Sequence, residues 1–185
     1  IIQKMFQEIC GIELNDEVTF TLRQIGEIRE NDEYSGYRVA LTADYPPMAV
    51  PLKLDVTTGD KITPKEIEYS FKLLLEDRSI SILAYNLETI LAEKLETVIS
   101  RSDQNTRPRD YYDIYVLMKL QSQNIDLPSL KEALAATCKK RGSAETVKGY
   151  KQIMDQVKNS AVMQEQWSRY QKEFDYASDI PFEDT

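Results

Sequence analysis

Two cations fall at helical spacing in the middle of the chain. Lys94 comes seven residues after Leu87, inside an apolar stripe, and Arg101 comes another seven residues on, so both share one face of a predicted helix. A lysine at such a position can be a partly desolvated ammonium directed at phosphate oxygens, with Arg101 adding a second, planar contact. It can equally extend its ammonium to solvent and pair with Glu93 or another carboxylate. Periodicity alone favours neither interpretation.

Two aspartates open the next predicted helix. Asp110 and Asp113 are three residues apart and share a face with Ile114 and Leu117, so both carboxylates start the buried side of the helix. Acids in a first turn complement the helix dipole and bond free N–H groups, which accounts for one aspartate better than for two. A carboxylate held here could accept a proton from an attacking hydroxyl, as phosphoryl transfer requires, and the neighbouring Arg109 could help neutralise phosphates.

A third candidate lies on a predicted strand. Residues 50–57 alternate apolar and polar side chains, and Lys53 and Asp55 fall on the polar side. A strand carboxylate beside a cation can hold a magnesium ion or orient a nucleophile. Taken alone, the pair is better explained as the polar face of a half-solvated sheet.

Composition limits the chemistry. The 185 residues contain no histidine and only two cysteines, Cys10 and Cys138. Histidine-dependent nucleophile systems and zinc sites are therefore excluded, and a disulfide framework is not expected. Oxygen ligands and hard cations remain. The net charge of −8 disfavours general nucleic-acid binding and suits a basic partner. No signal peptide or membrane-spanning run is found, so we expect a cytoplasmic protein that does not bind membranes.

The pattern predicts an α+β protein with a β-rich first part and a helical second part. The β-rich part, residues 1–85, begins with a short helix and continues with a hairpin and further strands, whereas 67–75 also fits a helix. The helical part, residues 86–175, starts at the N-cap Asn86, and the last ten residues, 176–185, read as an acidic tail. The expected elements are a helix at 1–10, a hairpin at 18–43 with its turn at 30–36, strands at 50–57, 67–75 and 79–84, and helices at 86–101, 107–120, 129–141, 146–158 and 162–174.

Two segments together resemble a known family. The run 91–101, followed by 106–113, is similar to the third and fourth motifs of AbiEii-type nucleotidyltransferases, which are toxins of abortive-infection and toxin–antitoxin systems. Upstream, 52–56 with 59–64 resembles the family segment that carries a third strand carboxylate. Two motifs in order at suitable spacing are more specific than either one.

This resemblance implies a polymerase-β-like nucleotidyltransferase: a remnant of its mixed sheet followed by a C-terminal helical bundle. The implied reaction moves a nucleotidyl group from an NTP, with GTP as a candidate, to tRNA or another RNA, with Mg²⁺ as cofactor and a cognate antitoxin as partner. By position Asp55 would be a metal-binding carboxylate, Lys94 a phosphate-binding lysine and Asp110 an essential acid or base. The residues expected to bind substrate around them are Lys53, Arg101, Arg109 and Asp113.

One departure from the family pattern matters. Such enzymes open with a Gly-Gly-Thr or Gly-Ser turn followed by Asp-x-Asp, and no such motif precedes Asp55. We therefore expect an N-terminally incomplete chain, with degeneration as the other explanation, and little activity from this chain alone. The alternative function is a non-catalytic, nucleotidyltransferase-like module that binds a protein partner.

Overall fold

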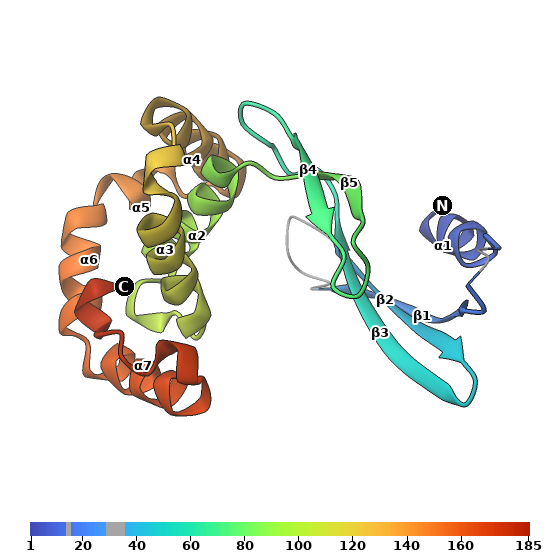
Figure 1. Cartoon of the computed structure of the whole chain (residues 1–185). Helices are drawn as coiled ribbons and strands as arrows, with labels where there is room; N and C mark the ends of the chain where they lie inside the picture. The colour runs from blue at the N-terminus through green and yellow to red at the C-terminus, as the bar shows by residue number, and fades with distance from the viewer. Residues whose placement is uncertain (14–15, 29–35) are drawn as a thin grey trace. The chain divides into compact units, whose positions relative to one another are not determined.

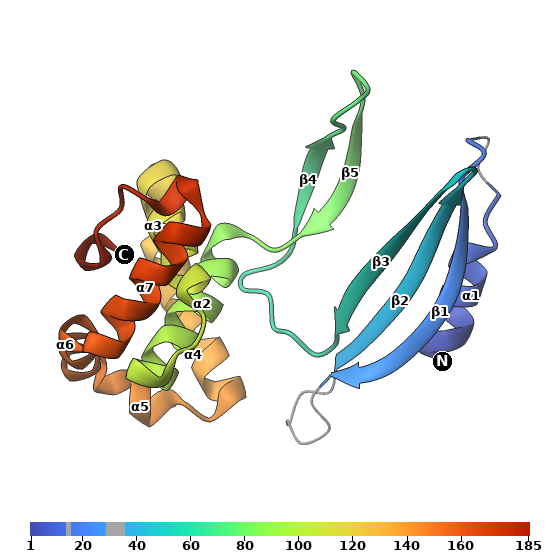
Figure 2. The same cartoon turned by 90° about the horizontal axis from the view of Figure 1, so that it is seen from below.

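The computed structural model describes residues 1–13, 16–28 and 36–185. They form two compact units, Ile1–Asp60 and Lys61–Thr185, and Figures 1 and 2 show the chain from two sides. Helices and antiparallel sheets are both present, so the predicted α+β class is confirmed. The boundary between the units lies after Asp60, before the predicted change from strands to helices near residue 85. This is because the last two strands, between residues 67 and 84, belong to the same unit as the helices.

The first unit is an antiparallel sheet with a helix on it. Strands β1 (Thr19–Ile28), β2 (Gly36–Tyr45) and β3 (Met48–Thr57) pair in chain order, and α1 is Ile2–Cys10. The short helix, the hairpin and the third strand are thus confirmed, and β3 starts slightly earlier than predicted. The predicted turn at 30–36 lies, except for its last residue, outside the described residues.

Alternation along the strands places the core of this unit on one face of its sheet. Phe6 of α1 is buried against Val39 and Leu41 of β2, and the register sets Leu54 opposite Val39 on β3. Because neighbouring residues of a strand point to opposite faces, Asp55 must lie on the other, polar face.

The second unit begins with a hairpin and continues as helices. Strands β4 (Ile67–Lys72) and β5 (Ser79–Ala84) pair antiparallel, so 67–72 is a strand rather than a helix. The expected helix at 146–158 is instead two helices separated by Gly149, a poor helix former. The α-helices of this unit are α2 (Leu87–Arg101), α3 (Pro108–Gln121), α4 (Leu127–Arg141), α5 (Ala144–Lys148), α6 (Tyr150–Asn159) and α7 (Ala161–Glu173).

The start of α2 is fixed by side-chain hydrogen bonds. Asn86 caps the helix as predicted, since its Oδ1 accepts a bond of 2.7 Å from Thr89 N–H. Its Nδ2 donates to the carbonyl oxygens of Thr63 and Lys65. Glu88, also buried, accepts a bond of 2.9 Å from the backbone N–H of Asp126, which is the N-cap residue of α4. One helical turn therefore anchors two other segments.

A buried ion pair joins α2 to the end of α4. Glu96 is buried, and its Oε2 lies 2.5 Å from Arg141 Nη1, while its Oε1 accepts from Ser100 Oγ at 2.8 Å. Burial raises the pKa of the Glu96 carboxyl, but the polar side chains of Ser143, Arg141 and Ser100 around it outweigh this effect, so the net shift is downward. Helix α4 ends at Arg141, as predicted, and the next residue, Gly142, stops it with a left-handed φ of 66°.

The residues after α7 are anchored to the core by two buried side chains, although most of their neighbours are exposed. The expected tail forms the 3₁₀ turns Asp175–Ala177 (η3) and Phe182–Asp184 (η4), and Ala177 and Ile180 belong to the core of the second unit. Trp167 Nε1 donates to the Ile180 carbonyl oxygen at 2.8 Å. The acidic composition of this segment predicted a solvated tail. Ala177 and Ile180 are buried instead because they pack in the same core as the apolar side chains of α7.

Replacing Ile180 tests that packing. Ile180→Ala should lower the free energy of unfolding by about 2–3 kcal/mol, because it removes buried methyl groups and leaves a cavity. Asp179→Ala, at an exposed neighbouring position, should change it by no more than about 0.5 kcal/mol. Chemical denaturation measures both, and equal effects would mean that the segment is a solvated tail.

Replacing Glu96 tests the buried ion pair. Glu96→Gln should destabilise the protein by about 1–3 kcal/mol at neutral pH, since it removes the charge facing Arg141. The folded-state pKa of Glu96 lies below its ordinary value of 4.5, so its contribution is complete above that value and disappears as pH falls through the lowered pKa. Denaturation curves of both proteins should therefore converge in acid. A difference that is independent of pH would contradict the charge argument.

Candidate functional site

Three of the predicted site residues meet in the second unit. Lys94 of α2 places its Nζ 3.3 Å from Asp110 Oδ1 and 2.6 Å from Asp113 Oδ2, both on α3. The spacing of three residues on α3 puts both carboxylates on the side of that helix facing α2. Lys94 thus pairs with carboxylates of the neighbouring helix, as the second interpretation of its position allowed, and the two aspartates face inward as predicted.

This Lys94–Asp110–Asp113 cluster is partly desolvated. The side chains of the three residues are 22%, 15% and 25% exposed, respectively, so their interaction is screened less than that of a surface pair. Two carboxylates and one ammonium leave a formal charge of −1. The ammonium has three N–H donors, and the aspartates take two of them.

Asp110 has an unused acceptor. Its Oδ2 is buried and has no hydrogen-bond partner among the residues that the structure describes. An unsatisfied buried oxygen on an ionised group is costly unless a ligand or water supplies a donor. The cluster therefore contains a carboxylate oxygen suited to a hydroxyl donor.

The turn before α3 sets the position of Asp110. Asn105 is fully buried, and its Oδ1 accepts from the Arg107 N–H at 3.1 Å. Pro108 then starts the helix, where its missing N–H is not needed, and Asp110 N–H donates to the Arg107 carbonyl at 3.0 Å. Ser102, at the end of α2, has a φ of 50°, a left-handed value that lets the chain turn sharply.

The adjacent Tyr111 belongs to the core. It is buried, and its ring meets Phe182 edge-on with centroids 5.7 Å apart. Burial raises the pKa of its hydroxyl to about 12, against the opposing effect of the nearby Asn105 side chain. It is therefore a packing residue, and Trp167 and Tyr170 likewise anchor α7 in this core.

Asp55 lies in the first unit, on the polar face of β3. Its carboxylate makes a two-pronged ion pair with Arg38 of β2, with both N–O distances at 2.7 Å. This hydrogen bonding lowers the pKa of Asp55 and raises that of Arg38, although both side chains are half-exposed. Lys53, two residues earlier, is exposed on the same face of the strand. The predicted metal-binding role of Asp55 stays a prediction.

The two predicted arginines differ in exposure. Arg109 is 79% exposed, and its Nε lies 3.9 Å from Asp113 Oδ2, so it borders the Lys94–Asp110–Asp113 cluster and points mainly to solvent. Arg101 is half-buried in the last turn of α2. Their substrate-binding roles are untested predictions.

Sequence reasoning missed the polar groups that support this arrangement. No role was predicted for Glu96, Arg141 or Asn105. The available signal was the spacing 92–96–100, which aligns Glu96 with the buried Ala92 on α2. No spacing rule would have paired Glu96 with a residue 45 positions away.

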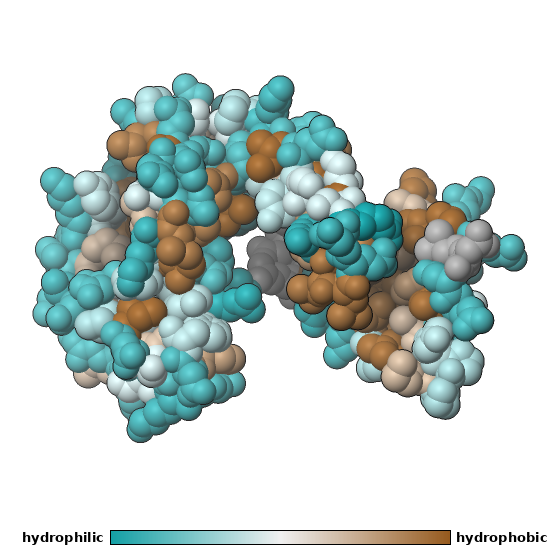
Figure 3. All heavy atoms as spheres, in the orientation of Figure 1, coloured by the Kyte–Doolittle hydropathy of each residue, from teal (hydrophilic) through white to brown (hydrophobic). Residues whose placement is uncertain are grey.

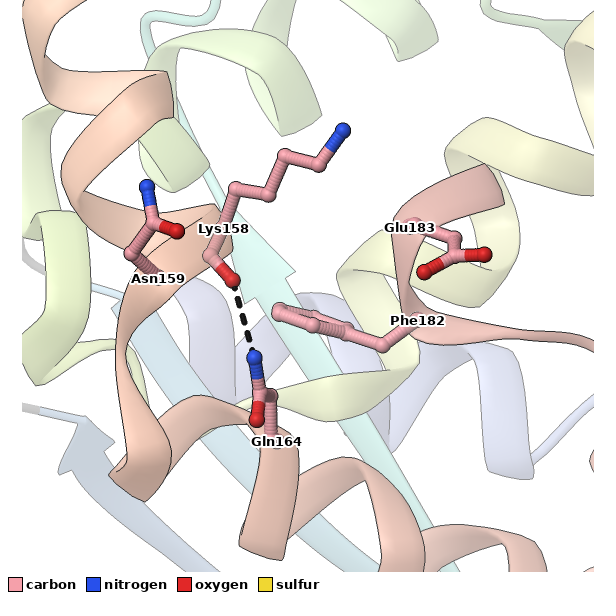
Figure 4. Close-up of a pocket in the computed structure, with 5 residues that line it drawn as sticks. All are labelled: Lys158, Asn159, Gln164, Phe182 and Glu183. Atoms are coloured by element: carbon pink, nitrogen blue, oxygen red, sulfur yellow. Dashed lines mark hydrogen bonds between the residues drawn. The ribbon is translucent and has the colours of Figure 1, made fainter.

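The second unit also contains a surface pocket, which none of the predicted site residues lines. Its volume is about 370 Å³, and Figure 4 shows Phe182 entering it between the side chains of the other lining residues, which are Lys158, Asn159, Gln164 and Glu183. Gln164 Nε2 donates to the Lys158 carbonyl oxygen at 3.1 Å. The pocket lies at the junction of α6, α7 and η4.

The residues that the structure describes do not by themselves form the metal site that the resemblance implies. Among them, no group of three or more histidine, cysteine, aspartate or glutamate side chains could hold an ion. Asp110 and Asp113 are already bound to Lys94, and Asp55 is bound to Arg38. In the same described ranges, no helix is long and apolar enough to cross a membrane.

Of the comparisons with known proteins, one gives a match. No curated protein and no solved structure matches the chain. One family model, described as "Nucleotidyl transferase AbiEii toxin, Type IV TA system", matches residues 1–185. The motifs around Lys94 and Asp110 agree with that match, and the chain belongs to the AbiEii family of nucleotidyltransferase toxins of type IV toxin–antitoxin systems.

Proposed function

We propose that this protein takes part in moving a nucleotidyl group from an NTP to an RNA acceptor, with tRNA as the first candidate. The observation that supports this is the Lys94–Asp110–Asp113 cluster, with a buried acceptor oxygen on Asp110 that lacks a described partner. The family itself implies a nucleotide substrate and an antitoxin partner. The acceptor and GTP as donor are the parts we add.

Asp110 is proposed to act on the attacking hydroxyl. In nucleotidyl transfer the hydroxyl oxygen of the acceptor forms a bond to the α-phosphorus, and the bond from that phosphorus to the bridging oxygen breaks. Pyrophosphate leaves with the bond electrons, and the hydroxyl proton must go to a base. Asp110 Oδ2 would accept that proton, because Oδ1 is already directed at Lys94.

Lys94 is proposed to serve two purposes. Its positive charge lies between Asp110 and Asp113 and offsets the repulsion between two carboxylates that share one site. Its third donor can bind a phosphate oxygen. Arg109 would add an exposed cation at the border of the cluster, whereas Asp113 holds Lys94 in place.

Nucleotidyltransferases of this family generally use a divalent metal. We propose Mg²⁺ and keep Asp55 as a candidate ligand, which would have to exchange Arg38 for the ion. Because Asp55 is half-exposed, that exchange requires little desolvation. We expect residues 1–185 alone to transfer little label, since one strand carboxylate does not hold a metal pair.

Substitution of the cluster tests the proposal directly. In the toxin as expressed from its gene, Asp110→Asn and Lys94→Met should each lower label transfer from α-labelled NTPs to tRNA by about 100-fold or more, the loss expected when a positioned base is removed. Gel analysis of the labelled RNA measures transfer. Thermal unfolding of the same variants separates lost chemistry from lost folding.

The matched control is Arg169→Gln. Arg169 is exposed and pairs with Glu165 on the surface of α7, so its replacement should leave transfer unchanged. If the Asp110 and Lys94 variants retained wild-type transfer and toxicity, the cluster would be structural. The protein would then be better described as a non-catalytic module that binds a partner.

A second pair of substitutions tests Asp55. If Asp55 binds a metal, Asp55→Asn should lower transfer, and Arg38→Ala should not, because it only frees the carboxylate. If the ion pair is structural, both variants should lose the same small amount of stability, because so exposed a pair contributes little, and transfer should be unaffected. Transfer measured against Mg²⁺ concentration distinguishes the two results.

A further inference from the structure

The β4–β5 hairpin has one apolar face that is open to solvent. The register pairs Tyr69 with Ile82 and Phe71 with Ile80, and directly opposed residues point to the same face. Apart from Leu83, the alternate positions on the other face are polar. The exposed fractions of the large apolar residues on the open face are Ile67 41%, Tyr69 51%, Phe71 44%, Ile80 39% and Ile82 41%.

Such a face calls for a covering partner. A two-stranded hairpin is at best marginally stable alone in water, and contiguous apolar patches of this kind mark interaction sites. The tip of the hairpin adds Leu74 and Leu75, which are almost fully exposed. In Figure 3 apolar, brown side chains lie at the surface over the tip of the hairpin.

The charges of the hairpin argue against RNA as the partner. Two exposed aromatic rings could stack on bases, but phosphate binding needs available cations. Lys72 pairs with Asp77 at 3.4 Å, and Arg78 pairs with Glu76 at 3.0 Å. With Glu68, residues 67–84 carry two cations and three anions, a net charge of −1. A strongly basic protein is also a poor candidate, because the hairpin carries almost no net negative charge for it to bind.

A nearly neutral, flat and apolar face is complementary to itself. From the exposed fractions, the five apolar residues of this face and the two tip leucines together expose on the order of 800 Å² per copy, which is the most they could bury and about what each partner gives to a standard-size interface. Strand β5 carries no charged residue, so two hairpins can approach without repulsion despite the net charge of −8 of the whole chain.

We propose that this face is a homodimer interface, in which the β4–β5 hairpins of two copies pack face to face about a two-fold axis. Tyr69 and Phe71 of one copy would lie on Ile80 and Ile82 of the other, in two sheets about 10 Å apart. The inference concerns assembly and is independent of the proposed reaction.

Mass measurement by sedimentation equilibrium tests the proposal. The protein should have twice its chain mass of 21.4 kDa, with dissociation on dilution. Phe71→Glu places charge in the interface and should weaken dimerisation at least about tenfold, which corresponds to ~1.4 kcal/mol. The matched control Ser70→Glu adds the same charge to the opposite face and should leave the dimer intact. Circular dichroism verifies that both variants fold.

Three outcomes would overturn the proposal. They are a wild-type protein that is monomeric at every concentration tested, a dimer that Phe71→Glu leaves unchanged, and equal dissociation by Ser70→Glu. If Phe71→Glu fails to fold, the milder Ile80→Ser gives the same readout. Binding of a labelled single-stranded RNA by a monomeric wild type, lost in Ile80→Ser, would assign the face to RNA instead.

Discussion

The second unit depends on polar groups of α2 that are buried and must be paired by other segments. Glu88 and Glu96 are buried acids, and Thr89 is a fully buried hydroxyl. A helix satisfies its own backbone, but it satisfies such side chains only in part: Ser100 of α2 bonds one oxygen of Glu96, and the remaining polar atoms need partners from other segments. Their partners come from Thr63, from Asp126 and from Arg141. Each pairing fixes where one more part of the chain must lie.

The same constraint explains the site. Lys94 lies on α2 between the turns that hold Glu88 and Glu96, so the hydrogen bonds of those acids limit how far α2 can rotate or slide. Asp110 is fixed independently by the Asn105 turn and by Tyr111 in the core. The ammonium therefore meets two carboxylates whose positions were set by other contacts, which is the condition for a pre-organised site.

Much of this could be predicted from the sequence, and the limits have physical causes. Elements with a strong local signal were correct, such as the Asn86 cap and the Gly142 stop, because a cap is a local interaction. Lys94 and Asp110 were singled out by spacing and by resemblance. The Glu96–Arg141 pair and the packing of Ile180 depend on contacts between distant segments, and no local pattern encodes those. The position of Asp55 on the polar face of a strand could be predicted, but its partner Arg38 could not, because that pairing depends on the register between β2 and β3.

The orphaned oxygen of Asp110 bears on whether the cluster is structural or chemical. A buried ion pair adds little stability compared with apolar residues of the same volume, because desolvation offsets the attraction. An unsatisfied buried acceptor lowers stability further, by about 1–3 kcal/mol. A purely structural cluster would gain by pairing Asp110 Oδ2 with a nearby donor, as Glu96 pairs both its oxygens. In the proposed reaction, the acceptor hydroxyl would supply the donor that Asp110 Oδ2 lacks, and that hydrogen bond would offset the cost of the unpaired oxygen.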